Sequence, residues 1–208
     1  MEKKSRQATS LKPKNLDRDF FVRDTLTVAR ELLGRRLVRV LDGSRLSGRI
    51  VEVEAYIGGG DQACHASHGR TRRNATMFGP PGHAYVYFIY GMHHCLNVVT
   101  EQEGYPAAVL IRALEPLEGV EAMRARRGGV PNVRLTSGPA RLCQALEIDR
   151  WFDGADLCAP DALLLIEEDT AVPDEAVATS PRVGVRGDAT ALSAPWRFYI
   201  QGNRHVSR

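Results

Sequence analysis

The stretch of residues 49–65 constrains the fold most, because it changes from strand to loop within a few positions. Its first half, Arg-Ile-Val-Glu-Val-Glu-Ala-Tyr, is rich in β-branched residues and predicts a strand. Side chains alternate between the two faces of a strand. This alternation puts Ile50, Glu52, Glu54 and Tyr56 on one face, and Val51, Val53 and Ala55 on a core face. The polar face is either solvated or part of a site beside the glycine loop of residues 58–60.

The segments around this strand favour antiparallel pairing. Residues 37–41 predict a strand, and Asp42-Gly43 is typical of a hairpin turn into the next one. A second hairpin is predicted where a strand breaks at Gly91 and residues 95–100 return. Further strands are expected at 107–114, 163–166, 183–185 and 196–200, and helices at 26–33, 116–123 and 140–146. The fold class is therefore α+β: a single domain with a curved antiparallel β-sheet, peripheral helices and a protruding β-hairpin.

Length and composition predict one domain, residues 16–208, preceded by a basic tail of residues 1–15. All four lysines lie within the first fourteen residues. The apolar runs are too short for a membrane span, and the first residues lack the apolar stretch of a secretion signal. Four widely spaced cysteines favour reduced thiols. We expect an intracellular monomer without membrane association: cytoplasmic, at the nucleoid, in a bacterium, or nuclear in a eukaryote.

Charge is distributed unevenly along the chain. No acidic residue lies between Asp61 and Glu101, whereas that interval contains five of the six histidines and Arg70, Arg72 and Arg73. Residues 147–175 are instead rich in Asp and Glu. An acid-free face suits a polyanion such as nucleic acid. Within the same interval Tyr90 falls at the expected hairpin tip, where an aromatic ring has no core to enter.

The histidines, cysteines and charge distribution suggest two functions, a zinc site and a nucleic-acid-binding module. Cys64, His65, His68, His93, His94 and Cys95 could suggest zinc, but their spacing lacks the usual Cys-x-x-Cys pattern, and we expect no metal. The zinc-deaminase signature is also absent. A non-catalytic nucleic-acid-binding module would explain the charge distribution. It would leave Glu54 unexplained, because a carboxylate beside a polyanion weakens binding unless it takes part in chemistry.

Several long motifs resemble the alkyladenine (3-methyladenine) DNA glycosylase family. They are Glu-Val-Glu-Ala-Tyr with the following Ala-Cys-His, Arg-Arg-Asn-Ala-Thr-Met-Phe-Gly-Pro-Pro-Gly, Tyr-Val-Tyr-Phe-Ile-Tyr-Gly-Met, Val-Leu-Ile-Arg-Ala-Leu-Glu-Pro-Leu-Glu-Gly and Ser-Gly-Pro-Ala-Arg-Leu-Cys-Gln-Ala-Leu. The resemblance runs from about Leu16 to the C-terminus. It implies an enzyme without cofactor or metal that flips damaged purines out of double-stranded DNA and hydrolyses the N-glycosidic bond. The chain departs from the family at Gly58-Gly59-Gly60 and at His93 and His94.

The resemblance also implies roles for individual residues. Glu54 corresponds to the general base that activates water, and Arg112 to the arginine beside that water. Tyr90 corresponds to the side chain inserted into the duplex. The base-binding residues would be Tyr56, His65, Tyr87 and Asn97, the last crowding the amino group of guanine. Arg70, Arg72 and Arg73 are expected to contact the DNA backbone.

General chemistry agrees with this assignment. A base inside a duplex cannot be reached without extrusion. Purines alkylated at N3 or N7 are cationic, and tyrosine faces attract cations. The same charge makes the base a good leaving group, so one carboxylate suffices. No lysine lies in the expected domain, and a monofunctional enzyme that uses water is predicted.

Overall fold

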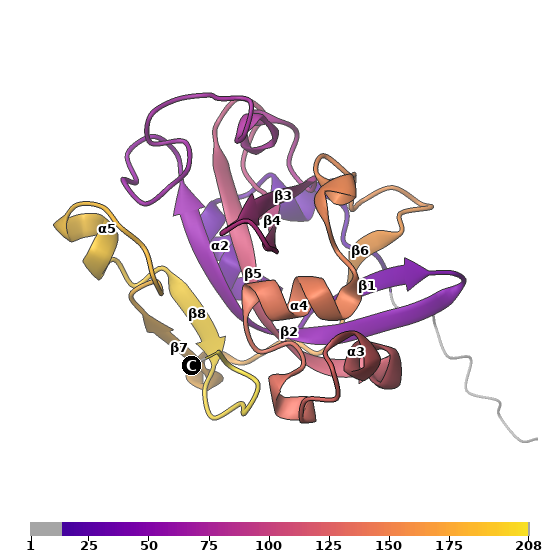
Figure 1. Cartoon of the computed structure of the whole chain (residues 1–208). Helices are drawn as coiled ribbons and strands as arrows, with labels where there is room; N and C mark the ends of the chain where they lie inside the picture. Colours follow the sequence, from indigo (N-terminus) through magenta and orange to yellow (C-terminus); the bar gives the residue numbers. More distant parts are fainter. Residues whose placement is uncertain (1–13, 208) are drawn as a thin grey trace, which may run out of the picture.

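The structure, a computed structural model, describes residues 14–207 and confirms the α+β class (Figure 1). β1 (Arg36–Leu41) and β2 (Ser44–Ile57) form the predicted hairpin. Its turn residues Asp42 and Gly43 both have positive φ, 49° and 74°, as the tight turn requires. β2 is the longest strand and sweeps across the molecule, so it carries the polar face of Glu52 and Glu54 to the sheet's interior.

Eight strands in the described part of the chain form one antiparallel sheet. The others are β3 (Ala84–Ile89), β4 (His93–Val99), β5 (Ala107–Glu118), β6 (Leu164–Glu167), β7 (Val177–Ser180) and β8 (Arg197–Ile200). The order is β3-β4-β5-β2-β1-β6, with β8 joining β2 and β7 joining β8. β2 therefore has neighbours on both sides, which buries nearly its whole length.

Short helices surround this sheet. They are α1 (Arg18–Phe21), α2 (Thr25–Leu32), α3 (Val120–Arg126), α4 (Pro139–Leu146) and α5 (Ala189–Ser193). The predicted helices near residues 26–33 and 140–146 are confirmed as α2 and α4. α2 packs on β2 and β5, and α4 packs on β4 and β5. Their buried residues, such as Leu32 and Leu142, join the main hydrophobic core.

Three expectations about local structure were wrong. Pro116 does not open a helix; it pairs with Gly48 inside β5, and α3 begins at Val120 after Gly119 takes a left-handed conformation. Residues 183–185 form a loop, and the nearby strand is β7 instead. Ile50 packs in the same core as Val53 and Ala55, because irregular β2–β5 register between Ile50 and Val53 interrupts the simple alternation.

Of the predicted basic tail, only Lys14 and Asn15 are described. Asn15 forms an isolated antiparallel bridge with Glu167 of β6. Residues 1–13 of that tail lie outside the described residues. None of the helices within residues 14–207 is long and apolar enough to cross a membrane.

Candidate active site

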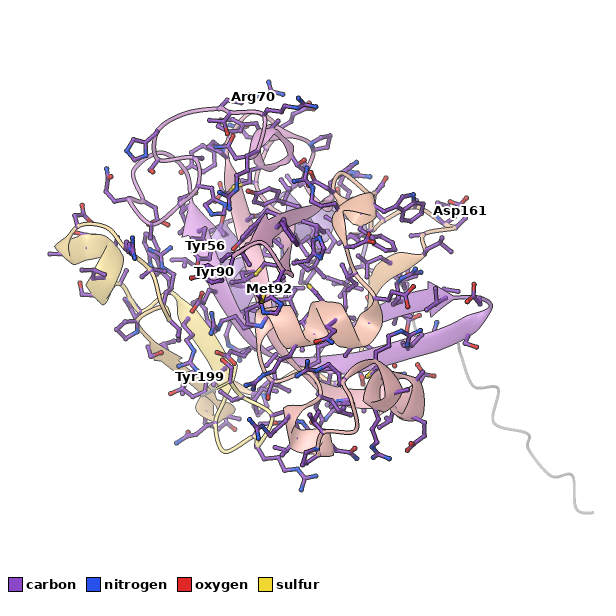
Figure 2. The ribbon with its side chains drawn as sticks, in the orientation of Figure 1. Tyr56, Arg70, Tyr90, Met92, Asp161 and Tyr199 are labelled. Carbon is purple, nitrogen blue, oxygen red and sulfur yellow. The ribbon has the colours of Figure 1, made fainter. Side chains whose placement is uncertain are left out.

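A cavity of about 550 Å³ lies where the end of β2, the β3–β4 hairpin and the loop after β7 meet. Its walls include Tyr56, His65, Tyr87, Tyr90, Asn97 and Arg112, so six of the predicted site residues line one space. Among these, Figure 2 shows Tyr56 and Tyr90 close together beneath the loop that carries Arg70. The far wall is Val183, Gly184, Val185 and Arg186.

Glu54 is fully buried and held by three donors at the inner end of this cavity. The Tyr56 hydroxyl donates to Oε2 at 2.9 Å, and Arg112 Nη1 lies 3.1 Å from the same oxygen. The backbone N–H of Val183 donates to Oε1 at 2.7 Å. All three donors belong to residues that line the cavity. The carboxylate thus lies directly behind these wall residues, and the alternative of a solvated face is wrong.

Glu52 shares the polar face but contacts a different set of groups. Its carboxylate accepts from Arg112 Nε and Arg197 Nε, each at 2.8 Å, and from the Ser207 backbone N–H at 2.6 Å. Burial by itself raises the pKa of Glu52, but the Arg112 charge and the bonds from Ser207 and Arg197 hold the pKa below its ordinary value. Glu52 itself lies outside the cavity wall, and it anchors Arg112 and the C-terminal segment.

Arg112 joins these two carboxylates. Burial disfavours its charge, yet Glu54 and Glu52 together raise its pKa, so the guanidinium stays protonated. A buried arginine within a strand must be paired or reach a site, because burying an unpaired charge is costly. Arg112 does both, because it pairs with two acids and lines the cavity.

Tyr56 is placed by a second buried ion pair that the sequence analysis did not anticipate. Arg182 and Asp61 are both fully buried and joined by two contacts of 2.5 and 2.7 Å. The Arg182 guanidinium lies 4.7 Å from the centre of the Tyr56 ring. Burial and the adjacent Glu54 charge raise the pKa of Tyr56, so its hydroxyl remains a donor. Asp61 and Arg182 are 121 residues apart, and nothing local in the sequence links them.

His65 and Tyr87 form the aromatic wall. Their ring centres are 4.5 Å apart in an edge-to-face arrangement. Tyr85 is 1% exposed and meets His65 Nδ1 at 2.9 Å through its hydroxyl. Asn97 is also buried, and its amide donates to the Tyr85 carbonyl at 3.1 Å. The predicted base-binding residues thus lie around one cavity.

Tyr90 is at the tip of the β3–β4 hairpin and is 82% exposed. Both Tyr90 and Gly91 have positive φ, 54° and 68°, which closes the turn tightly and leaves the ring projecting. Met92 beside it is 68% exposed. Large exposed apolar side chains on a hairpin tip are typical of a binding surface.

The three arginines predicted to contact the DNA backbone are exposed, and the cavity wall includes none of them. Arg73 packs over the Tyr87 ring at 5.6 Å, and Arg70 lies 5.9 Å from the Phe78 ring. Arg70 lies on the loop at the top of Figure 2, away from Tyr90. Arg72 is exposed on the same loop. Their contact with DNA stays a prediction.

The described histidines and cysteines that were considered as zinc ligands do not form a metal-binding group. Within residues 14–207 no group of three His, Cys, Asp or Glu side chains is arranged to hold a metal ion. Cys64 and Cys95 line the cavity instead, and burial raises the pKa of the Cys64 thiol to about 11.

Comparison with known proteins is consistent with this geometry. A family model described as methylpurine-DNA glycosylase matches residues 19–204. A protein of Methanocella arvoryzae is 53% identical over 197 residues, covering 93% of this chain and 96% of that protein. One of Streptomyces avermitilis is 50% identical over 194 residues, covering 92% and 90%. Both bear the provisional name 3-methyladenine DNA glycosylase. The chain belongs to the methylpurine-DNA glycosylase family.

Proposed function

We propose that this protein removes alkylated purines, 3-methyladenine among them, from double-stranded DNA by hydrolysing the N-glycosidic bond. The observation that carries the proposal is the buried carboxylate of Glu54, held by three residues that line an aromatic cavity. Family membership and the names of the relatives support the same substrate class. The DNA of a cell is the substrate, so we place the activity inside the cell.

The cavity fits a flipped purine with positive charge. Its volume of about 550 Å³ is in the range of small-molecule sites. Tyr56, His65 and Tyr87 provide aromatic surface, and a cation over such a ring gains roughly 0.5–2 kcal/mol. Asn97 at the wall would crowd the amino group of an undamaged guanine. A neutral, normally paired purine gains less here and costs more to extrude.

Glu54 is the general base in this proposal. A water molecule next to the sugar gives its proton to the Glu54 carboxylate while its oxygen bonds to C1′. The C1′–N bond breaks, and its electron pair neutralises the departing purine cation. Arg112, 3.1 Å from Glu54, orients the carboxylate and water. The products are a free base and an intact abasic site.

Tyr90 is the side chain that inserts into the duplex in this proposal. Its exposed ring would take the gap left by the flipped nucleotide and stack on the neighbouring bases. Such stacking is worth about 1–3 kcal/mol, which is comparable with the cost of extrusion. Arg70, Arg72 and Arg73 would then contact phosphates nearby.

The decisive experiment is an abasic-site assay on a duplex with a single 7-methylguanine or 3-methyladenine. We expect alkali-labile sites at the lesion and release of the free methylated base. A matched duplex without the lesion should remain uncut after alkali. Tight DNA binding with no abasic sites on either lesion would contradict the proposal and support a non-catalytic binding module.

A further inference from the structure

His65 is fixed at two points, one on its imidazole ring and one on its backbone. Its ring nitrogen Nδ1 lies 2.9 Å from the Tyr85 hydroxyl of β3. Its backbone carbonyl accepts from the Asn74 amide at 2.8 Å. Asn74 is itself 1% exposed and also bonds the carbonyl of Gly69. The imidazole therefore has a defined orientation before any ligand arrives.

The direction of the Tyr85–His65 hydrogen bond follows from burial. Tyr85 is 1% exposed, and its hydroxyl has no other hydrogen-bond partner in the described part of the chain. A buried hydroxyl needs an acceptor for its proton. Burial also raises the pKa of Tyr85, so the phenol stays protonated. The O–H thus donates to Nδ1, and His65 is the neutral tautomer with its proton on Nε2.

The electrostatics of the wall also favour the neutral imidazole. His65 is exposed in the free protein, but its ring packs against Tyr85 and Tyr87. This partial desolvation, and then the charge of Arg73, lower the pKa of His65 below its ordinary value of 6.5. A protonated His65 would carry a proton on Nδ1 facing the Tyr85 hydroxyl. The titratable or charged groups around His65 and the cavity wall are Tyr85 and Tyr87 of β3, Tyr90 of the hairpin tip, Cys95 of β4, Cys64, His68 and Arg73 of the loop, and Tyr56, Arg112 and Arg186.

We infer that Tyr85 is a positioning residue that holds His65 as a neutral imidazole with its proton on Nε2, and that this state lets the cavity accept a cationic purine. A charged imidazole beside Tyr87 would repel such a purine across the site. The neutral ring instead stacks and offers one N–H to a lone pair of the nucleotide. The inference rests on the proposed function, because it requires that an alkylated purine occupies this cavity.

The test compares the parent with Tyr85→Phe on a cationic and a neutral lesion, 7-methylguanine and hypoxanthine. Single-turnover excision, or competition binding where hypoxanthine is released too slowly, is measured between about pH 5 and pH 8, where histidine titrates. Loss of the hydroxyl removes a bond to the neutral imidazole. For 7-methylguanine, the acidic limb should therefore move up by about one pH unit, so that excision on that limb falls by up to about tenfold. Hypoxanthine should show a clearly smaller shift.

Two matched variants separate positioning from packing. Tyr105→Phe removes a phenol hydroxyl outside the cavity wall and should leave both profiles unchanged. His65→Gln in the Tyr85→Phe background removes the titrating group and should abolish the shifted limb. Equal loss of excision at every pH and for both lesions would assign Tyr85 a packing role and overturn the inference.

Imidazole nitrogen chemical shifts of the free parent protein give a readout that needs neither substrate nor variant. We expect His65 to be protonated at Nε2 alone and to stay neutral below pH 6.5. A proton on Nδ1 would overturn the inference even if excision occurred. Failure of the parent to release either base would instead count against the proposed function, whatever the tautomer.

Discussion

At the scale of residues, Glu52 and Glu54 are the instructive pair. Both are fully buried on one face of β2, two positions apart, and both contact Arg112. Glu52 is surrounded by two arginines and Ser207. Among the described residues, those that bond Glu54 all belong to the cavity wall. The same residue type thus has two separate roles, one in stability and one, as we propose, in catalysis.

Replacing Glu54 by Gln should remove the base while keeping the volume and an acceptor for Tyr56. Excision should fall by about 10²–10⁴-fold, the usual contribution of general-base assistance. Lesion binding should persist, because the aromatic wall is unchanged. Single-turnover excision and a binding titration check this, with the exposed Glu103→Gln as control. Full excision by Glu54→Gln would require another base.

Glu52→Gln should act mainly on stability. Removal of one partner from a buried ion pair costs about 3–5 kcal/mol of unfolding free energy. Because the folded-state pKa of Glu52 is below 4.5, its carboxylate stabilises fully above pH 4.5, and this contribution is lost as pH falls through the folded pKa. The unfolding midpoint of the parent should therefore drop in that acidic window, and that of the variant should change less. Glu121→Gln, with an 80% exposed side chain, is the control; an unchanged midpoint in Glu52→Gln would contradict the anchoring role.

The sequence predicted the residues of the site better than it predicted the residues that hold them in place. Glu54, Tyr56 and Arg112 could be singled out because a charge or phenol interrupts an apolar strand. Arg182 and Ser207 could not, because they meet Asp61 and Glu52 from 121 and 155 residues away. For the pair of Asp61 and Arg182, the only signal in the sequence was Asp61, an acid beside the glycine loop. Such long-range partners follow from the packing of the whole sheet, which local patterns do not encode.

At the scale of elements, the β3–β4 hairpin was predictable because its chemistry is local. A strand rich in tyrosine, a break at Gly91 and a returning strand are enough to place Tyr90 at the tip. The predictions for Pro116 and residues 183–185 were wrong for the opposite reason, because the structure there is not decided locally. Proline is common at helix starts, but this one lies in β5 opposite Gly48, where the strands come so close that a side chain at position 48 would meet Leu114 and Glu115. Val183 and Val185 have strand propensity but serve as cavity wall.

The hairpin tip can be tested as an element that flips bases without doing chemistry. Tyr90→Ala should fold normally, because the ring is 82% exposed. Loss of about 1–3 kcal/mol of stacking should lower the flipped population by roughly one to two orders of magnitude. Excision of a well-paired lesion should therefore fall more than that of a mismatched one. A fluorescent base analogue at the lesion reports flipping directly, and Trp151→Ala, a 70% exposed aromatic outside the cavity wall, is the control. If Tyr90→Ala still flips the base fully, Tyr90 is not the side chain that inserts into the duplex.

At the scale of the whole molecule, the distribution of amines limits the reaction. All four lysines lie in the first fourteen residues, and the folded part that follows has none. Lys14, the one lysine in the described region, has a 70% exposed side chain beside Asp17, and the cavity wall does not include it. Arginine stays protonated and cannot attack as an amine. The charges around Glu54 are accordingly carried by arginines, which bind and orient but do not form Schiff bases.

This distribution predicts a monofunctional enzyme. A bifunctional glycosylase attacks C1′ with an amine and forms a Schiff base, which borohydride reduces to a stable protein–DNA adduct. Borohydride added during turnover of this protein should trap no adduct, while alkali added afterwards should reveal abasic sites at every lesion processed. A variant with all four lysines changed to Arg keeps the charge and should excise at the parental rate under saturating enzyme. An adduct that forms with the parent and disappears in this variant would show that a lysine of the N-terminal segment reaches the cavity, and the reaction would then not depend on water alone.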